Sequence, residues 1–229
     1  MFEDVLKSGA PELSAEAIEA CRNYWQLVKK KNEVMNLTAV TDDDEAAGRH
    51  FLDSLELLKL EAFGGRRVID VGTGAGFPGV PLKLAQPDIS LCLLDSLNKR
   101  VDFLAEACAQ LGVDAECLHA RAEEQALKPE YRDSFDIAVS RAVARLNVLA
   151  ELCLPFVKPG GVFMAMKAGA SAEELREAKN AIKTLGGGLE RVYEYELDGV
   201  RRSVAVIRKL SPTLRGYPRR FARIQKQPL

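Results

Sequence analysis

The sequence predicts an α/β fold: a mostly parallel sheet with crossover helices, an antiparallel last strand and a helical N-terminal extension. From Gly64 onward, short β-branched runs alternate with helical patterns, which is typical of parallel strands joined by helices. The first run, 67–71, breaks into a glycine-rich turn. The last two runs flank Asp198-Gly199, a hairpin signal that adds an antiparallel strand.

The first 63 residues read as a helical extension. A helix is expected over 14–32, with Ser14 as its N-cap. Its apolar stripe, at helical spacing, consists of Ile18, Cys21, Trp25 and Val28. Lys29-Lys30-Lys31 ends this helix, where lysines suit the helix dipole and could also touch phosphate. A second helix opens with the acidic run 42–45, which the dipole alone explains without a metal.

The remaining elements are expected in order along the chain. Strands are predicted at 67–71, 89–94, 114–118, 135–139, 160–167, 190–197 and 201–208. Helices are predicted at 78–86, 97–110, 145–154 and 171–185. We therefore divide the chain into an extension (1–63), an α/β domain (64–210) and a basic tail (211–229).

The turn after the first strand, 72–79, contains three glycines at every second position. Glycine permits φ > 0 and removes the Cβ, so a ligand can lie directly on the backbone. With Asp70 just before it, the turn suggests the nucleotide loop of a class I, S-adenosylmethionine-dependent methyltransferase. The same residues also satisfy the dinucleotide fingerprint G-x-G-x-x-G, with Asp95 about twenty residues further on. Pro78 and Pro81 disfavour that alternative, because the third fingerprint glycine should pack an unbroken helix start on the sheet.

Ligands in such sheets bind at the carboxyl ends of the strands. The residues at these ends are Gly72 to Phe77, Asp95, Ala122-Glu123, Ser140-Arg141 and Lys167. Asp95 could accept hydrogen bonds from a ribose diol, or it could cap the next helix, as Ser96 could equally well. Ala122-Glu123 could serve an adenine, and N–H groups of the glycine turn could hold a methionine carboxylate.

The residues at the strand ends also limit which kind of atom could accept the methyl group. None of the five cysteines sits at a strand end, where cytosine C5 methylation needs a nucleophile. The position of an Asn/Asp-Pro-Pro-aromatic motif, common for exocyclic amines, reads Ser140-Arg141-Ala142-Val143. Guanine N7 has no proton to lose, so positioning could suffice without a general base. Arg141 could then hold guanine O6, phosphate or cofactor, or form a structural salt bridge.

Composition and charge bound the remaining possibilities. The 229 residues carry a net charge of −1, and the N-terminus has neither the basic region nor the apolar core of a signal peptide. A cytosolic protein with reduced core cysteines and no metal site is expected, since its five cysteines and two histidines are scattered. After Asp198 the chain has basic residues and no acid. That end is either a footprint for a polyanion or a solvated tail kept for solubility.

Six motifs in order resemble one family. They are Asn36-Leu37-Thr38-Ala39-Val40, Arg49-His50-Phe51-Leu52-Asp53-Ser54-Leu55, the loop 70–79, Leu94-Asp95-Ser96-Leu97-Asn98-Lys99-Arg100, Arg121-Ala122-Glu123 and Ser140-Arg141-Ala142. Together they closely resemble the RsmG family (glucose-inhibited division protein B), bacterial guanine-N7 methyltransferases of 16S ribosomal RNA. Residues 217–220 resemble the basic tail of that family, whereas Phe221-Ala222-Arg223-Ile224 departs from its usual Pro/Gly-rich continuation.

The resemblance implies methylation of a guanine in the 530 loop. It also implies S-adenosylmethionine contacts at Gly72, Phe77, Ala122, Glu123 and Arg141. With the residues reached from the strand ends, the expected cofactor set is Gly72, Gly74, Gly76, Phe77, Asp95, Ala122, Glu123 and Arg141.

The expected partner is 16S rRNA or the small ribosomal subunit, bound by a monomer. RNA contacts are expected from Arg141, Lys167, Arg49, Arg219 and Arg220, although Lys167 could be a plain surface lysine. An NAD-dependent oxidoreductase and a non-catalytic RNA-binding protein with a vestigial nucleotide site remain as alternatives.

Overall fold

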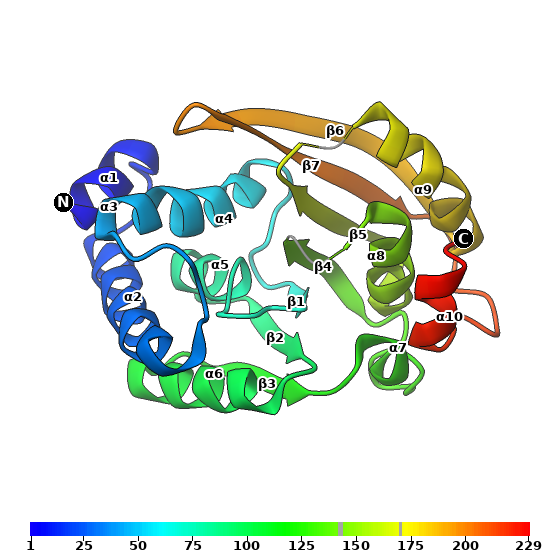
Figure 1. Cartoon of the computed structure of the whole chain (residues 1–229), viewed down its shortest axis with the longest axis horizontal. Helices are drawn as coiled ribbons and strands as arrows, with labels where there is room; N and C mark the ends of the chain where they lie inside the picture. Colours follow the sequence, from blue (N-terminus) through cyan, green and yellow to red (C-terminus); the bar gives the residue numbers. More distant parts are fainter. Residues whose placement is uncertain (142–143, 170) are drawn as a thin grey trace.

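The computed structural model describes residues 1–141, 144–169 and 171–229, so Ala142, which belongs to one of the six motifs, lies outside the described residues. The centre of the molecule is a seven-stranded sheet of order β3-β2-β1-β4-β5-β7-β6 (Figure 1). The strands are β1 (Arg67–Val71), β2 (Ser90–Asp95), β3 (Ala115–His119), β4 (Phe135–Arg141), β5 (Val157–Lys167), β6 (Gly187–Leu197) and β7 (Val200–Lys209). β1 to β5 pair in parallel, and β7 inserts antiparallel between β5 and β6.

Alternate residues of the inner strands point into two separate hydrophobic cores. Val68 of β1 and Leu93 of β2 belong to the core shared with the N-terminal helices, α5 (Gly79–Ala85) and α6 (Asn98–Leu111). Ile69 and Val71 of β1 face the second core. The helices of that second face are α7 (Ala122–Gln125), α8 (Leu146–Cys153), the 3-10 turn η3 (Leu154–Phe156), α9 (Ala172–Thr184) and α10 (Phe221–Lys226). The parallel strands are thus covered on both faces, as their continuous apolar runs require.

The N-terminal extension is helical, as predicted, but more broken than the sequence suggested. It contains α1 (Phe2–Gly9), α2 (Ala15–Met35), α3 (Asp43–Ala46), the π-helix η1 (Ala47–Leu52), α4 (Asp53–Leu55) and the 3-10 turn η2 (Glu56–Lys59). Ser14 caps α2 by accepting a hydrogen bond from the Ala17 N–H, at 3.1 Å. Asp42 caps α3 in the same way through the Glu45 N–H, at 2.9 Å, so capping accounts for this acid of the run.

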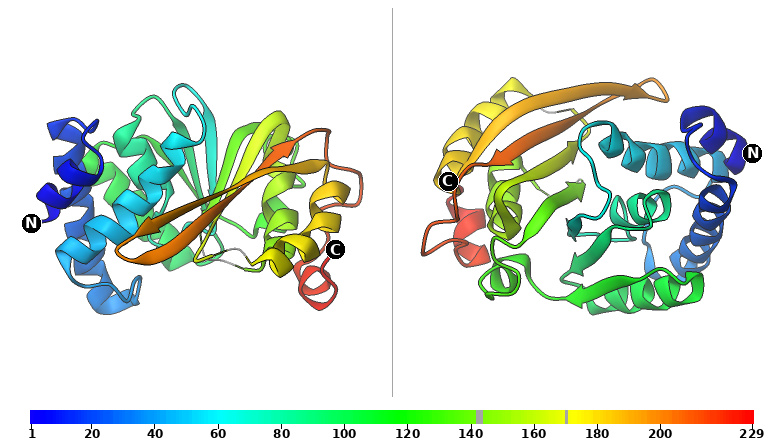
Figure 2. Two further views of the ribbon diagram at one scale, coloured as in Figure 1. Left: turned by 90° about the horizontal axis from the view of Figure 1, so that it is seen from above. Right: turned by 180° about the vertical axis from the view of Figure 1, so that it is seen from behind.

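The C-terminal tail is held to the second face of the sheet by buried polar groups. Lys209, at the end of β7, is completely buried and donates to Asp133 Oδ1 (2.8 Å) and to the hydroxyl of Thr213 in the tail (2.6 Å). Further along, Arg219 donates to both carboxylate oxygens of the fully buried Glu151. The N-terminal helices and the C-terminal tail lie at opposite ends of the molecule in every view (Figures 1 and 2).

Most predicted strands and helices are present, with shifts of one to a few residues. The predicted strand at 160–167 begins earlier, at Val157, because the positive φ of Gly160 is accommodated within the strand. The short helices α1, α7 and α10 were not predicted. No helix within the described ranges is long and apolar enough to cross a membrane. All five cysteines are free, and all but Cys117 are buried, as predicted.

Candidate functional site

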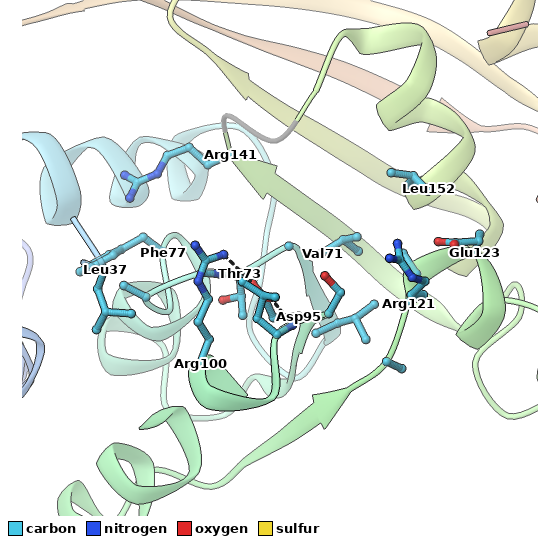
Figure 3. Close-up of a pocket in the computed structure, with 18 of the residues that line it drawn as sticks. Leu37, Val71, Thr73, Phe77, Asp95, Arg100, Arg121, Glu123, Arg141 and Leu152 are labelled. Atoms are coloured by element: carbon cyan, nitrogen blue, oxygen red, sulfur yellow. Dashed lines mark hydrogen bonds and ion pairs between the residues drawn. The ribbon is translucent and has the colours of Figure 1, made fainter. Parts of the chain in front are cut away.

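A cavity of about 610 Å³ opens at the carboxyl ends of β1, β2 and β4 (Figure 3). Its floor consists of the loop after β1 together with Asp95 at the end of β2. One end, the Arg141 end, is lined by Leu37, Thr38, His50, Phe77 and Arg141. The other, the Phe221 end, is lined by Ala120, Arg121, Ala122, Glu123, Leu152 and Phe221. The volume is typical of a small-molecule cofactor site.

Asp70 organises the glycine loop from beneath. Its Oδ2 accepts hydrogen bonds from the Thr73 hydroxyl (2.7 Å) and from the Gly79 N–H (2.8 Å). The carboxyl group is completely buried, and this burial raises its pKa to about 6. A Cβ at Gly79 would lie only 2.9 Å from Asp70 Oδ2, so glycine is required at that position. Asp70 therefore supports the loop and is not among the residues that line the cavity.

Gly74 and Gly76 have different roles in the loop. Gly74 has a φ of +60° and lines the cavity, and a Cβ there would meet no atom within 4 Å. Its backbone is half-buried but borders the cavity, where it can accept a flat ligand directly. Gly76 is buried on the far side of the loop, where a Cβ would overlap the Tyr24 hydroxyl. Gly76, expected in the cofactor set, instead permits the loop to pack against α2.

Asp95 is 4% exposed and fixes the centre of the cavity floor. Its Oδ2 accepts from the Gly74 N–H (3.0 Å), and its Oδ1 accepts from the Leu97 N–H (2.9 Å). Arg100 lies 3.5 Å from Oδ2. Asp95 does not cap α6, whose N-cap residue is Leu97 and which has no side-chain cap hydrogen bond; its bond to the Leu97 N–H lies in the turn before the helix. A carboxylate has about four acceptor sites, so these bonds leave capacity for a ligand hydroxyl.

The Arg141 end is aromatic and cationic. His50 stacks on Phe77 with ring centroids 4.7 Å apart, and the Arg141 guanidinium lies 5.2 Å from the centre of the Phe77 ring. His50 Nε2 lies 2.8 Å from Thr38 Oγ1, and its Nδ1 lies 3.4 Å from Arg141. Burial, aided by the Arg141 charge, lowers the pKa of His50 to about 3. His50 is therefore neutral near pH 7 and is not a general base with a matched pKa.

Asp53 holds Arg141 in place. Its carboxylate is 1% exposed, accepts hydrogen bonds from Arg141 (3.0 Å) and the Tyr195 hydroxyl (2.7 Å), and forms an ion pair with Arg202 at 3.2 Å. Tyr195 and Arg202 belong to the β6–β7 hairpin, so one buried carboxylate joins the N-terminal extension, β4 and the hairpin. The salt bridge considered for Arg141 from the sequence is present, and it aims the guanidinium at this end of the cavity.

The π-helix η1 carries the residues that complete the Arg141 end. It contains Arg49 and His50, and it runs directly into Asp53. Short π-helical turns occur frequently at functional sites, because the extra residue per turn redirects side chains. Gly48 within it packs against the hairpin, where a Cβ would lie 2.7 Å from Asp198 Oδ2.

Apart from Arg141, the four residues predicted to contact RNA differ in their solvent exposure and in their ion pairs. Arg49 and Arg220 are exposed, although Arg49 also pairs with Glu45 at 2.6 Å. Lys167 is 14% exposed and pairs with Glu174 at 2.7 Å. The Arg219 side chain is 11% exposed, and Glu151 occupies it. In this structure the cations of Lys167 and Arg219 are thus paired with carboxylates of the chain itself.

Several residues that line the cavity or lie beside it were given no individual role from the sequence. Thr38, His50 and Asp53 lie within the quoted motifs, but only the fold shows that they converge on Arg141. Phe221 could have been suspected only from its departure from the usual tail. No local pattern marks a residue as lining a cavity more than a hundred positions away.

The sheet order, with its antiparallel pair at one edge, and a cavity above a glycine loop define a class I S-adenosylmethionine-dependent methyltransferase. Solved structures share this fold: a methyltransferase from Aquifex aeolicus aligns with a TM-score of 0.54 at 19% identity, covering 80% of this chain and 97% of that one. The Thermus thermophilus 16S rRNA N2 G1207 methyltransferase, solved with AdoMet and guanosine, aligns with a TM-score of 0.52 at 20% identity, over 69% of this chain and 42% of that one.

The chain belongs to the rRNA small subunit methyltransferase G family, whose sequence profile matches residues 17–203. The "Ribosomal RNA small subunit methyltransferase G" of Clostridium kluyveri is 45% identical, covering 100% of this chain and 98% of that protein. The protein of the same name from Lachnoclostridium phytofermentans is 46% identical over 100% of this chain and 96% of its own. This membership confirms the resemblance and sets aside the dinucleotide-dependent oxidoreductase.

Proposed function

We propose that this enzyme transfers the methyl group of S-adenosylmethionine to N7 of a guanine in the 530 loop of 16S rRNA. The observation that carries the proposal is the Arg141 end of the cavity, which combines a cation with a neutral histidine whose pKa is about 3. Guanine N7 attacks through an in-plane lone pair and releases no proton. Positioning can therefore supply the catalysis, and a general base is not needed.

The cofactor pose follows from the chemistry of the two ends. Asp95 would bind the ribose hydroxyls, and Ala122 with Glu123 would bind the adenine. Gly72 and Gly74 would lie under the nucleoside, while Phe77 and Arg141 would flank the methionine end with its methyl group. The open backbone at Gly74 supports this pose, because a Cβ there would fill space that the ligand needs.

The remaining assignments concern the partner and the domains. We assign RNA contacts to Arg49 and Arg220, which are exposed. The division into an extension (1–63), a methyltransferase domain (64–210) and a tail (211–229) is supported by the position of the sheet, which begins at Arg67 and ends at Lys209. We propose a monomer that acts in the cytoplasm on rRNA, either naked or within the small subunit.

Transfer of labelled methyl groups tests the proposal directly. The enzyme is incubated with labelled S-adenosylmethionine and with small ribosomal subunits, naked 16S rRNA or DNA, and the labelled nucleoside is identified by mass. N7-methylguanosine from rRNA, mapped to the 530 loop, is the expected result. Label in a different nucleoside would overturn the assigned acceptor while retaining the cofactor. Arg141→Ala, assayed beside the native enzyme, should lose transfer to either rRNA substrate.

A further inference from the structure

The C-terminal helix α10 places an aromatic ring at one end of the cavity. Phe221 lines the cavity, and its ring lies 5.3 Å from Cζ of Arg121, another lining residue. Ile224, three positions further along, is completely buried in the core and attaches the helix. Phe221 remains only half-buried. Phe221 also packs against this core, but its side chain is not enclosed by it and contributes to the cavity lining.

The segment before α10 is fixed rigidly enough to hold that ring in place. The Arg219 backbone N–H and side chain both donate to Glu151 of α8, at 2.9 Å and 2.8 Å. Arg132 donates to the carbonyls of Tyr217 (2.7 Å) and Thr213 (2.8 Å). These bonds span more than sixty residues of sequence and place α10 beside α8 (Figure 1). The tail is thus a built part of the molecule at this end.

The Phe221 end has the chemistry of a slot for a purine. Leu152, only 6% exposed, and Ala122 supply apolar surface, and Glu123 supplies a buried carboxylate that can accept from an exocyclic amine. Figure 3 shows Arg121, Glu123 and Leu152 together at this end, away from Arg141 and Phe77. A flat base gains binding energy by stacking on an aromatic ring or a guanidinium plane.

We propose that Phe221 is a wall of the adenine subsite, so that the C-terminal tail is part of the cofactor site and helps to select the base. This inference rests on the cofactor pose proposed above. Arg121 positions the Phe221 ring, and adenine stacks against these two flat groups. Residues beyond the last strand thereby determine cofactor affinity.

Calorimetric binding of S-adenosylhomocysteine and of adenosine, without RNA, tests this wall. We expect Phe221→Ala to weaken both ligands by the same factor, on the order of tenfold, because each presents the same base. Phe221→Tyr should retain near-native affinity. Arg223→Ala is the matched control, since Arg223 is exposed on the same helix and does not line the cavity. Circular dichroism and the thermal midpoint report whether each variant is folded.

The outcomes separate this inference from the proposed function. Native affinity in folded Phe221→Ala, or an equal loss in Arg223→Ala, would overturn the adenine wall even if N7 transfer is confirmed. If Phe221→Ala loses affinity as expected but the enzyme methylates some other nucleoside, the adenine wall is supported. Only the assignment of guanine N7 as methyl acceptor is then overturned. Should Phe221→Ala not fold, hydrogen exchange of the native enzyme decides. Slower exchange of amides 221–226 with S-adenosylhomocysteine is expected, and unchanged exchange there contradicts the inference.

Discussion

The two ends of the cavity are built by different physical means. At the Arg141 end, a buried carboxylate, two guanidinium groups, a tyrosine and a neutral histidine form a polar network. At the Phe221 end, leucine, alanine and phenylalanine supply apolar surface beside Arg121 and Glu123, and the ion pair that fixes the tail is formed by residues that do not line the cavity. Both ends rest on the same sheet, but each is completed from a different side of it in the chain: His50 precedes the first strand, and Phe221 follows the last.

The difference predicts how each end responds to change. A buried ionic network needs every partner, because a charge left alone in the interior is very costly. Apolar walls lose affinity gradually as surface is removed. Changes at the Arg141 end should therefore impair folding and transfer together. Changes at the Phe221 end should lower cofactor affinity in an enzyme that remains folded.

The largest effect is expected from Asp53→Ala. It leaves Arg141 and Arg202 without their buried carboxylate, and removing one partner of a buried pair costs about 3–5 kcal/mol. Urea unfolding should show that loss in the free energy of unfolding, and methyl transfer should fall as well. Asp53→Asn, which retains the acceptor shape, should be milder. Native stability in Asp53→Ala would contradict the expected difference between the Arg141 end and the Phe221 end of the cavity.

Arg219→Ala should destabilise the tail by a comparable or smaller amount, about 3 kcal/mol, because Glu151 would become an unpaired buried charge. The completely buried state of Glu151 is the reason for expecting this cost. Limited proteolysis should detect earlier cleavage within 211–229 than in the native enzyme. Arg219→Ala together with Glu151→Leu should recover much of the stability, and failure to recover would contradict the ion-pair role.

Asp95→Ala tests the floor that the two ends share. Loss of hydrogen bonds to a charged group costs about 1.5–3 kcal/mol, so the dissociation constant for S-adenosylmethionine should rise by about 10- to 150-fold. Asp95 also accepts from Gly74 and Leu97, so a modest drop in the thermal midpoint should accompany this. Calorimetry measures the affinity, and Asp102→Ala on the exposed face of α6 is the control. Unchanged affinity would remove Asp95 from the cofactor site.

The pH dependence of stability should reveal the neutral His50. Its pKa is about 3 in the folded protein against a usual 6.5, so between those values the unfolded chain binds more protons and folding stability falls as the pH falls. Asp70 acts in the opposite direction between 3.8 and about 6, because its folded pKa is raised. Between pH 4 and 6, the free energy of unfolding of His50→Gln should rise less steeply with pH than that of the native enzyme. The two slopes should differ by about 1.4 kcal/mol per pH unit. An unaltered slope would contradict the burial of a neutral imidazole.

The smallest effect concerns Arg220, which is exposed. Arg220→Ala should weaken rRNA binding and reduce the salt slope of the logarithm of affinity by about 1, the value for one lost phosphate contact. Filter binding over a range of salt concentrations measures that slope, with Lys183→Ala on α9 as an exposed control. An identical slope would exclude Arg220 from phosphate contact.

The sequence predicted the sheet and the cavity floor because these depend on local patterns. The β-branched run 67–71, the glycine turn and Asp95 mark strand ends, and parallel strands bring such ends together. It could not predict that Gly76 serves α2, since that role depends on a hydroxyl fifty-two positions away. Nor could it separate Arg219 from Arg220, because adjacent residues in the tail face a buried carboxylate and solvent respectively.

The position of the tail at the end of the chain also affects when the cavity is completed during synthesis. The ribosome delivers the polypeptide from its N-terminus, and the sheet is complete once Lys209 has emerged. Phe221 follows twelve residues later. A nascent chain would thus fold its sheet and its Arg141 end before Phe221, the last part of the opposite wall, has been added. Cofactor affinity would be acquired late in synthesis, and a protease that removes only the final segment would leave a folded protein with a weakened hold on its methyl donor.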